Sequence, residues 1–270
     1  MMKQDIIKKF FITGDTHGQT ATKIKNLFTK FNIKDKEEVG LIILGDAGIN
    51  YYLDNRDIKA KKKIEYLGIS IYCVRGNHEE RPELIEGMQT KYDASVDGYV
   101  YYEPEYPHIN YFIDGNEYKI NKYRTLVIGG AYSVDKDFRL ARGGQWFPQE
   151  QLSEDERIKI ANQIKNKRYD LVLSHTCPIS WEPTDLFLNC IDQSTVDNSM
   201  EVWMEKIKDM FKWQIWCFGH FHADRIERPH VEMFFNDIEE LDAVWLRWHK
   251  YRTDGELDWW LDKSPNFYMY

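Results

Sequence analysis

Histidine, aspartate and asparagine residues gather in five short blocks along this chain, and each block follows a run of apolar residues. Five of the eight histidines lie inside these blocks, which random placement along the chain would rarely produce. The blocks are Gly14-Asp15-Thr16-His17-Gly18, Gly45-Asp46-Ala47-Gly48, Arg75-Gly76-Asn77-His78-Glu79, Ser174-His175-Thr176-Cys177-Pro178 and Gly219-His220-Phe221-His222.

The side chains of these blocks offer oxygen and nitrogen donors, which suit divalent ions such as Mn, Fe, Zn or Ni better than a thiolate site would. Asp15 and His17 are separated by one residue, as are His220 and His222. In an extended segment such pairs point the same way. A carboxylate such as that of Asp46 has two oxygens and can bridge two ions. Two ions about 3.5–4 Å apart would activate a shared water and hold an in-line displacement at phosphorus.

The apolar runs before the blocks have the length and composition of β-strands, and helix-like segments separate some of them. We predict strands at Ile6–Thr13, Val39–Leu44, Ile69–Val74, Thr125–Ile128, Leu171–Leu173 and Ile215–Phe218. We predict helices at Thr20–Phe31, Asp54–Leu67, Gln149–Lys167 and Ser199–Lys212. Continuous apolar runs separated by helices indicate strands that are covered on both faces. Because ligands bind beyond the carboxyl ends of such strands, we expect the five blocks to meet at one site.

Two stretches do not show this alternation of strand-like and helix-like segments. Residues 81–124 contain tyrosine-rich apolar segments and an Asp114-Gly115 hairpin signal, and they predict a β-rich insertion over one edge of the core. Residues 233–270 predict further strands, at Met233–Phe235 and Ala243–Trp248, and an aromatic tail. No repeat, low-complexity linker or compositional break divides the chain, so we expect a single domain over residues 1–270.

The composition disfavours some classes of partner and location. The 36 basic and 44 acidic residues give a formal charge of −8. The chain therefore has no excess of Lys and Arg that would bind nucleic acid non-specifically. No apolar stretch approaches the length of a membrane span, and the sequence shows no signal peptide. The four cysteines lack CxxC spacing, and together these features predict a cytoplasmic protein.

In order and in sequence the five blocks resemble the motifs of the calcineurin-like metallophosphoesterase superfamily. Its pattern is D-x-H, G-D, G-N-H with E or D, H, and G-H-x-H. The resemblance spans residues 14–222. It implies an α/β (α+β) fold in which a two-sheet β-sandwich is flanked by helices, and we expect this in place of a simple doubly wound sheet. It also implies two divalent metal ions, with Mn expected first and Fe, Zn, Ni or Mg as alternatives.

The same resemblance implies a role for each block. The ligands would be Asp15, His17, Asp46 and His222 for one ion, and Asp46, Asn77, His175 and His220 for the other, with Asp46 shared. His78 would bind no metal; it would lie beside the phosphoryl group and protonate the leaving oxygen or stabilise the transition state. Arg75 would orient the phosphoryl group.

The motifs of this chain match two different branches of the superfamily. The first and third blocks resemble the Ser/Thr protein phosphatase branch, whose second block continues as G-D-x-V-D-R-G. Here the acidic and arginine positions of that branch hold Ile49 and Asn50. The final Gly-His-x-His also occurs in the general bacterial and phage-type branch, to which we assign the chain. We therefore do not expect protein phosphatase activity.

The expected activity is hydrolysis of a phosphomonoester or phosphodiester by a metal-bridging hydroxide, with a phosphorylated small molecule or nucleotide as substrate. A metal-dependent nuclease acting on nucleic-acid ends and a non-catalytic scaffold of the same fold are the alternatives. A monomer and a homodimer both stay open.

Residues 129–146 hold weaker candidates for the rim of the pocket. Tyr132, Lys136 or Arg139 could lie there, and a solvated loop with a structural salt bridge is an equal alternative. Arg142 and Trp146 could line the substrate entrance.

Overall fold

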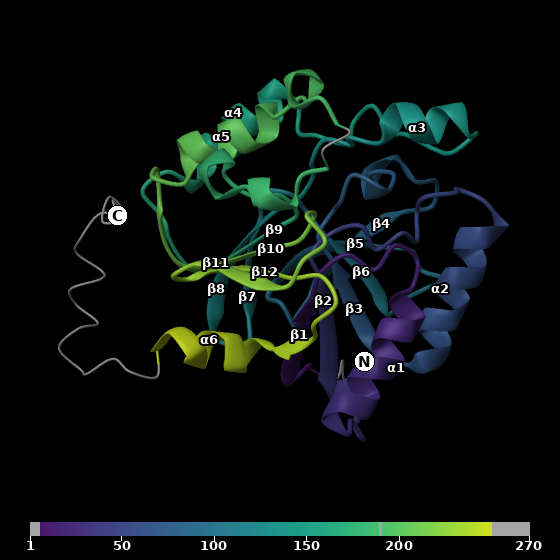
Figure 1. Ribbon diagram of the computed structural model, residues 1–270. Coiled ribbons are helices and arrows are strands. Elements are labelled where there is room, and N and C mark those ends of the chain that lie inside the picture. The colour runs from purple at the N-terminus through teal and green to yellow at the C-terminus, as the bar shows by residue number, and fades with distance from the viewer. Residues whose placement is uncertain (1–5, 189–190, 250–270) are drawn as a thin grey trace.

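The computed structural model describes residues 6–188 and 191–249, in which the strands form two mixed sheets with helices outside them (Figure 1). The strands of the first sheet are β1 (Lys9–Thr13), β2 (Val39–Ile43), β3 (Ser70–Cys73), β4 (Gln89–Asp93), β5 (Gly98–Tyr102), β6 (Ile109–Phe112) and β13 (Glu239–Glu240). Those of the second are β7 (Glu117–Ile120), β8 (Tyr123–Ile128), β9 (Arg168–Ser174), β10 (Lys212–Phe218), β11 (Arg225–Arg228) and β12 (Val231–Met233). Their orders are β13-β1-β2-β3-β6-β5-β4 and β11-β12-β10-β9-β8-β7.

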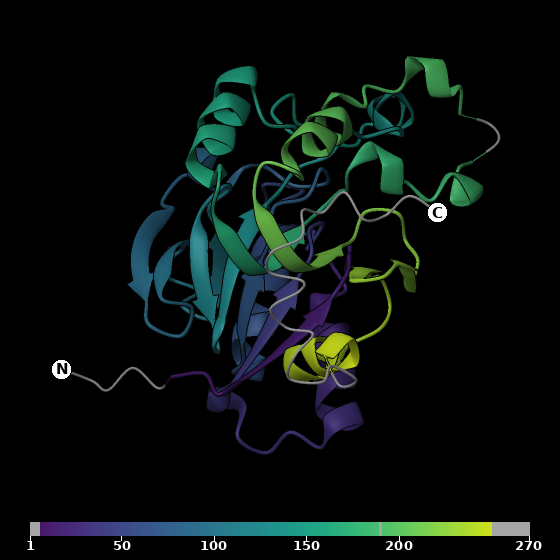
Figure 2. The same cartoon turned by 90° about the vertical axis from the view of Figure 1, so that its left-hand side faces the viewer.

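The α-helices flank the sheets. They are α1 (Thr20–Phe31), α2 (Asn55–Leu67), α3 (Lys136–Ala141), α4 (Glu154–Ile164), α5 (Ser199–Ile207) and α6 (Leu241–His249). Figure 2 shows α4 and α5 above the strands and α1 and α6 towards the bottom, as they also lie in Figure 1. The two-sheet sandwich flanked by helices confirms the predicted fold class.

Alternation of side chains explains why the central strands are apolar throughout. In β1, Phe10 and Ile12 belong to the core between the sheets, whereas Phe11 packs on the outer side with Ile24 and Leu27 of α1. Strands of the second sheet divide in the same way between the inter-sheet core and the layer under α4 and α5. Because successive residues of a strand point to opposite faces, a strand covered on both sides must be apolar at every position.

The directions of the strands bring the five blocks to one edge. β1, β2 and β3 are neighbouring parallel strands of the first sheet. β9 and β10 are neighbouring parallel strands of the second. Each block follows the carboxyl end of one of these five strands. The loops that carry the blocks are therefore adjacent within each sheet.

The segment 81–124 is β-rich as predicted, but its predicted place over one edge of the core is wrong. β6 pairs in parallel with β3, so that β6, β5 and β4 continue the first sheet. β7 pairs with β8 in the second sheet. Asp114-Gly115 is therefore no hairpin: it lies in the connection that passes from one sheet to the other.

The prediction of a strand at Ala243–Trp248 is also wrong, because these residues belong to α6. Leu241 and Val244 are buried in the inter-sheet core, and Trp245 and Trp248 pack against it. This spacing places the four side chains on one face of a helix. The predicted strand at Met233–Phe235 lies earlier, as β12, and the predicted aromatic tail lies outside the described residues.

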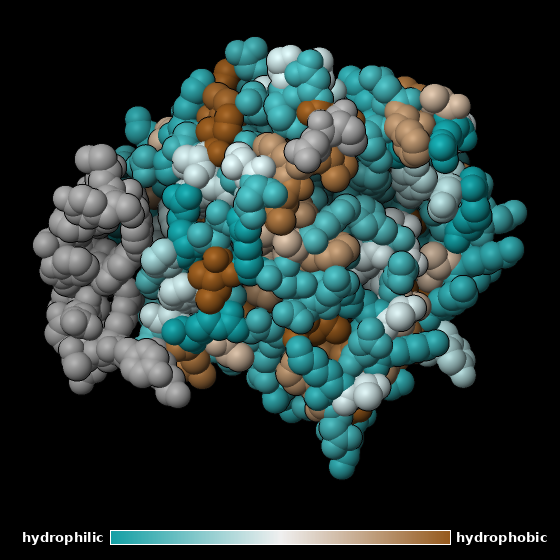
Figure 3. Space-filling view, viewed as in Figure 1, coloured by the Kyte–Doolittle hydropathy of each residue, from teal (hydrophilic) through white to brown (hydrophobic). Residues whose placement is uncertain are grey.

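The described surface of the face in Figure 3 is largely hydrophilic, with scattered apolar patches, as expected for a chain with 30% charged residues. In the part of the chain that the structure describes, no helix is long and apolar enough to cross a membrane.

Glu201 of α5 provides a pH-dependent prediction. Burial raises the pKa of this carboxyl from 4.5 to about 7, so its contribution to stability is present below about pH 4.5 and is lost as the pH rises through about 7. Glu201→Gln should remove this dependence. The free energy of unfolding of the wild type should fall relative to the variant by up to about 3 kcal/mol between pH 4.5 and 8. Urea unfolding of both proteins across this range measures the difference, and parallel curves would contradict the prediction.

Candidate metal centre

The loops at the carboxyl ends of the strands bring most of the predicted ligands together. Three groups have ligand atoms that all lie within 4.8 Å of one another: Asp15, His17 and His222; His17, Asp46 and His78; and Asp15, Asp46 and His175. The first and third combine residues from both sheets. Asn77, an amide, joins them through His175, as described below.

The backbone at four predicted ligands is left-handed. The φ angles of His17, Asp46, His220 and His222 are 43°, 48°, 69° and 54°. The expectation that paired ligands lie in extended segments is therefore wrong, since sharp turns after the strands aim these side chains. Left-handed backbone is unfavourable for residues with a Cβ atom, and such strain gathers at functional sites where the surrounding fold enforces it.

A chain of hydrogen bonds orients His175 and Asn77 so that a ring nitrogen of one faces the amide oxygen of the other. His175 Nδ1 donates to the carbonyl of Leu44 at 2.8 Å, so Nε2 of a neutral ring carries a lone pair. Asn77 Nδ2 donates to Ser133 Oγ at 2.9 Å, which leaves Asn77 Oδ1 facing His175 Nε2 at 2.8 Å. A divalent cation that took both atoms as ligands would satisfy them, so this pair fits a metal ion.

The Asp15 side of the centre shows a second crowded set of donor atoms. His17 Nε2 and His222 Nε2 are 2.8 Å apart. Asp15 Oδ2 lies 3.3 Å from His222 Nε2, and this buried oxygen accepts no hydrogen bond from the described residues. The other oxygen, Oδ1, is held by the backbone N–H of His220 at 2.9 Å. A carboxylate and two imidazoles with nitrogen and oxygen atoms this close form a donor set for a divalent ion.

Asp46 lies between these two sets. The backbone N–H groups of Asn77 and His78 both donate to its Oδ1 at 2.8 Å. Burial alone would raise the pKa of this carboxyl, but the imidazoles of His175, His78 and His17 outweigh burial and hold the pKa well below its usual range. The carboxylate is therefore ionised, and its fixed position suits a ligand shared by two ions.

His220 contributes a neutral ring. Burial, reinforced by the neighbouring His175, lowers the pKa of His220 to about 3, so the imidazole keeps a lone pair for a metal ion. It does not belong to the three compact groups, and its ring centroid lies 4.9 Å from that of His175.

His78 lies at the mouth of the centre with its side chain 22% exposed. Its ring is 5.2 Å from that of His17 and stacks on Tyr51 at 6.3 Å between centroids. Its Nε2 lies 3.6 Å from Asp135 Oδ1. An imidazole that is reachable from solvent and faces a carboxylate can hold or transfer a proton.

Arg75 does not have the surroundings predicted for it. Its side chain is 3% exposed, and Nε donates to Asp114 Oδ2 at 2.8 Å. The Nη atoms donate to backbone carbonyls, at 2.6 Å to Glu150 and 3.3 Å to Gly129. These contacts use the guanidinium to join the β3 loop to the loop after β8. The expectation that Arg75 orients a phosphoryl group is thus wrong, because its donors are occupied inside the protein.

Sequence reasoning missed the residues that orient the ligands. Ser133 accepts from the Asn77 amide, and its own N–H and O–H both donate to the Glu150 carboxylate. Asp135 faces His78. The sequence indicated the loop after β8 as a candidate for the rim of the pocket, but it singled out Tyr132, Lys136 and Arg139 instead of Ser133 and Asp135. No signal in the sequence singled out Glu150.

The centre has no room for a side chain at Gly76, which can be tested by substitution. A Cβ atom at this position would lie 2.0 Å from Asp46 Oδ1 and 2.2 Å from the Asp46 backbone nitrogen. Gly76→Ala should therefore displace Asp46, lower the free energy of unfolding by about 1–3 kcal/mol and weaken metal binding. Thermal unfolding and metal analysis measure both effects. Gly87→Ala is the control for metal binding: a Cβ there would meet no atom within 4 Å, and although its φ of 82° makes the substitution somewhat destabilising, the variant should keep its metal.

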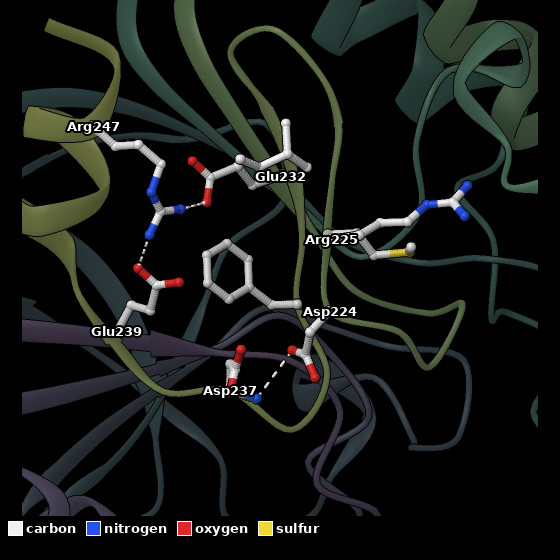
Figure 4. A pocket seen from close by; sticks show the side chains of 9 residues that line it. Asp224, Arg225, Glu232, Asp237, Glu239 and Arg247 are labelled. Atoms are coloured by element: carbon white, nitrogen blue, oxygen red, sulfur yellow. Dashed lines mark hydrogen bonds and ion pairs between the residues drawn. The ribbon is translucent and has the colours of Figure 1, made fainter.

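A cavity of about 200 Å³ lies next to α6 and contains none of the predicted site residues (Figure 4). In its wall Arg247 bonds two glutamates, and Asp224 accepts from the backbone N–H of Asp237 at 3.0 Å. Asp224 also accepts from the N–H of Phe235 at 2.7 Å, and the Phe235 ring stacks on His222 at 4.8 Å. The wall of this cavity therefore supports the last ligand loop.

Comparisons with known proteins agree with the five blocks. The sequence pattern of the calcineurin-like phosphoesterases matches residues 8–224, which include every predicted ligand. A comparison with curated proteins finds no match. Among solved structures, the chain is similar to a protein serine/threonine phosphatase from Saccharomyces cerevisiae with similarity to human phosphatase PP5, at 15% identity over 86% of this chain and 68% of that one. The TM-score of that match is 0.33, so we base no conclusion on it. From the match over residues 8–224, the chain belongs to the calcineurin-like phosphoesterase family.

Proposed function

We propose that this protein is a metal-dependent hydrolase of phosphoester bonds with a centre for two divalent ions. The observation that carries the proposal is the approach of His175 Nε2 to Asn77 Oδ1, 2.8 Å apart, two buried atoms that one divalent ion can take as ligands. Family membership supports phosphoester hydrolysis, and the donor atoms around Asp15 and Asp46 support metal binding.

We assign the ligands to the two ions as follows. The ligands are Asp15, His17, Asp46 and His222 for one ion, and Asp46, Asn77, His175 and His220 for the other. Two carboxylates against two divalent ions leave the centre positive, which attracts a phosphate. Nitrogen and oxygen donors of this kind accept several ions, and Mn²⁺ is the first to test, ahead of Fe, Zn, Ni and Mg.

The protein residues prepare the reaction at the centre. Bound ions would supply an activated water as nucleophile and positive charge for the phosphoryl oxygens. Asp46 is fixed by two backbone N–H groups, so it needs little rearrangement to bind metal. His78 lies at the solvent-facing mouth, where it protonates the leaving oxygen or stabilises its negative charge. The substrate is a phosphorylated small molecule or nucleotide.

The experiment that tests the function is a hydrolysis assay on metal-stripped protein refilled with Mn²⁺. It compares nitrophenyl phosphate, a monoester, with bis-nitrophenyl phosphate, a diester. We expect turnover that depends on Mn²⁺ and is lost on stripping. Two bound ions without turnover of either ester would count against a general phosphoesterase and favour a non-catalytic protein of this fold.

A further inference from the structure

Arg139 of α3 is a buried arginine whose guanidinium is only partly paired. Its side chain is 8% exposed, and its Nε lies 3.1 Å from Asp135 Oδ1, one helical turn earlier in the chain. Its Nη1 donates to the carbonyl of Gln145 at 3.2 Å. Its Nε forms no hydrogen bond in spite of its approach to Asp135, and its Nη2 is buried and has no hydrogen-bond partner among the described residues. A buried N–H without an acceptor is unfavourable, so this nitrogen indicates a missing acceptor.

Two routes of contact connect Arg139 with His78. On one side, Asp135 Oδ1 faces both Arg139 Nε and His78 Nε2, the latter at 3.6 Å. On the other side, Gln145 accepts from Arg139 and donates its N–H to the Tyr51 hydroxyl at 3.2 Å, and the Tyr51 ring stacks on His78. Asp135 on one side and the Gln145–Tyr51 pair on the other therefore connect the guanidinium with the imidazole of His78.

Asp135 places a negative charge beside His78, at the mouth of the centre. Asp135 alone would repel a phosphoryl group that approached His78. The Arg139 guanidinium compensates this carboxylate and keeps Nη2 as a spare donor. Arg75 differs in this respect, because its nitrogens are engaged with Asp114 and backbone carbonyls. Guanidinium groups form strong, directional hydrogen bonds with phosphate oxygens.

We propose that Arg139 binds the phosphoryl group of the substrate, that Asp135 holds the guanidinium in place, and that this favours phosphomonoesters over phosphodiesters. A monoester phosphate carries a charge of about −1.5 to −2 at neutral pH, and a diester carries a single charge, so an added cation stabilises the monoester more. The inference rests on the proposed phosphoester hydrolysis. It replaces the role that the sequence predicted for Arg75.

The experiment uses the Mn²⁺-loaded full chain and its Arg139→Ala and Arg139→Lys variants. Calorimetry measures the affinity for inorganic phosphate, and kinetics measure kcat/KM for nitrophenyl phosphate and bis-nitrophenyl phosphate. In Arg139→Ala we expect phosphate affinity and monoester kcat/KM to fall by about 10- to 100-fold, the size of one lost charge-assisted hydrogen bond. Diester kcat/KM should fall by a smaller factor, and metal content should not change.

Two further variants separate binding from structure. Arg124→Ala removes an equal charge from an exposed arginine at the start of β8, which pairs with Glu117 at 2.6 Å, and it should leave all readings unchanged. Asp135→Asn should weaken phosphate binding less than Arg139→Ala does. If Arg139→Ala does not fold, Arg139→Lys decides, because lysine keeps the charge but cannot contact Asp135, Gln145 and a phosphate together. We expect it to bind phosphate several-fold more weakly than the wild type.

The two proposals fail in different ways. Unchanged phosphate affinity in folded Arg139 variants, equal losses for both esters, or a wild type that binds no phosphate would overturn the role of Arg139. A wild type that binds metal and phosphate but hydrolyses neither ester would contradict the proposed hydrolysis. In that case weaker phosphate binding by Arg139→Ala would still support the binding role of Arg139.

Discussion

Replacing His175 with alanine should lower the metal content of the protein and reduce turnover by more than about 100-fold. The imidazole is fully buried, and its Nε2 faces Asn77 Oδ1 while Nδ1 is fixed by the Leu44 carbonyl. Loss of an outer partner of a metal ligand already costs about 10- to 100-fold in affinity or activity, so loss of the ligand itself should cost more. Elemental analysis of the purified variant and its turnover of nitrophenyl phosphate measure the two effects.

His108→Ala is the matched control, because it removes an imidazole from outside the centre. His108 pairs with Glu65 at 2.6 Å and belongs to none of the clustered ligands. The variant should keep its metal and its turnover. Normal turnover in His175→Ala, with metal retained, would remove His175 from the ligand set and would undermine the assignment of the second ion.

The sequence predicted the central strands because these strands are apolar at every position. In β1 and β2 every residue after Lys9 is buried, and the apolar ones pack against either the other sheet or the layer that contains α1 and α2, so the runs could be recognised without knowing their partners. The predicted helix Thr20–Phe31 has the bounds of α1, and its buried residues lie on one face. In these elements the apolar positions in the sequence are the positions that the fold buries, which is why the prediction succeeds.

The predictions failed where pairing partners decide the structure. Tyrosine-rich residues between 98 and 120 read as strands, but nothing local shows that β6 pairs with β3 while β7 pairs with β8. Residues 243–248 contain Val and Trp, which favour strands. The burial of Leu241 and Val244 on the inter-sheet core instead selects a helix. Such choices depend on contacts between segments that are far apart in the sequence.

In the candidate site, too, local sequence patterns could be recognised and contacts between distant segments could not. That these side chains gather at one place could be predicted because the five blocks repeat one arrangement, a strand followed by glycine and polar donors. The orienting residues could not, because Ser133 and Glu150 act on Asn77 from a loop 56 positions and more away in sequence. Arg75 shows the converse error. Its position beside a ligand block suggested a contact with substrate, and only the structure shows its guanidinium bonded to Asp114 and backbone carbonyls.

His78→Ala should retain the metal ions and lower turnover by about 10²- to 10⁴-fold, the usual contribution of a general acid or base. His78 belongs to a group with His17 and Asp46 whose ligand atoms lie within 4.8 Å, so geometry alone would also allow it to bind metal. Its contact with Asp135 favours a role in proton transfer. Metal analysis of the variant separates the two roles, since a ligand would lower the metal content and a proton donor would not.

The leaving group provides the second measurement on His78→Ala. Nitrophenolate leaves without help from an acid, whereas an alkoxide requires a proton, so loss of a general acid should slow an alkyl phosphate more than nitrophenyl phosphate. Equal losses for the two esters, with metal retained, would indicate that His78 stabilises charge on the phosphoryl group and donates no proton. A fall in metal content together with the rate would instead place His78 among the ligands. Because His78 lies between the clustered ligands and Asp135, these outcomes decide where the metal centre ends and the proton-transfer machinery begins.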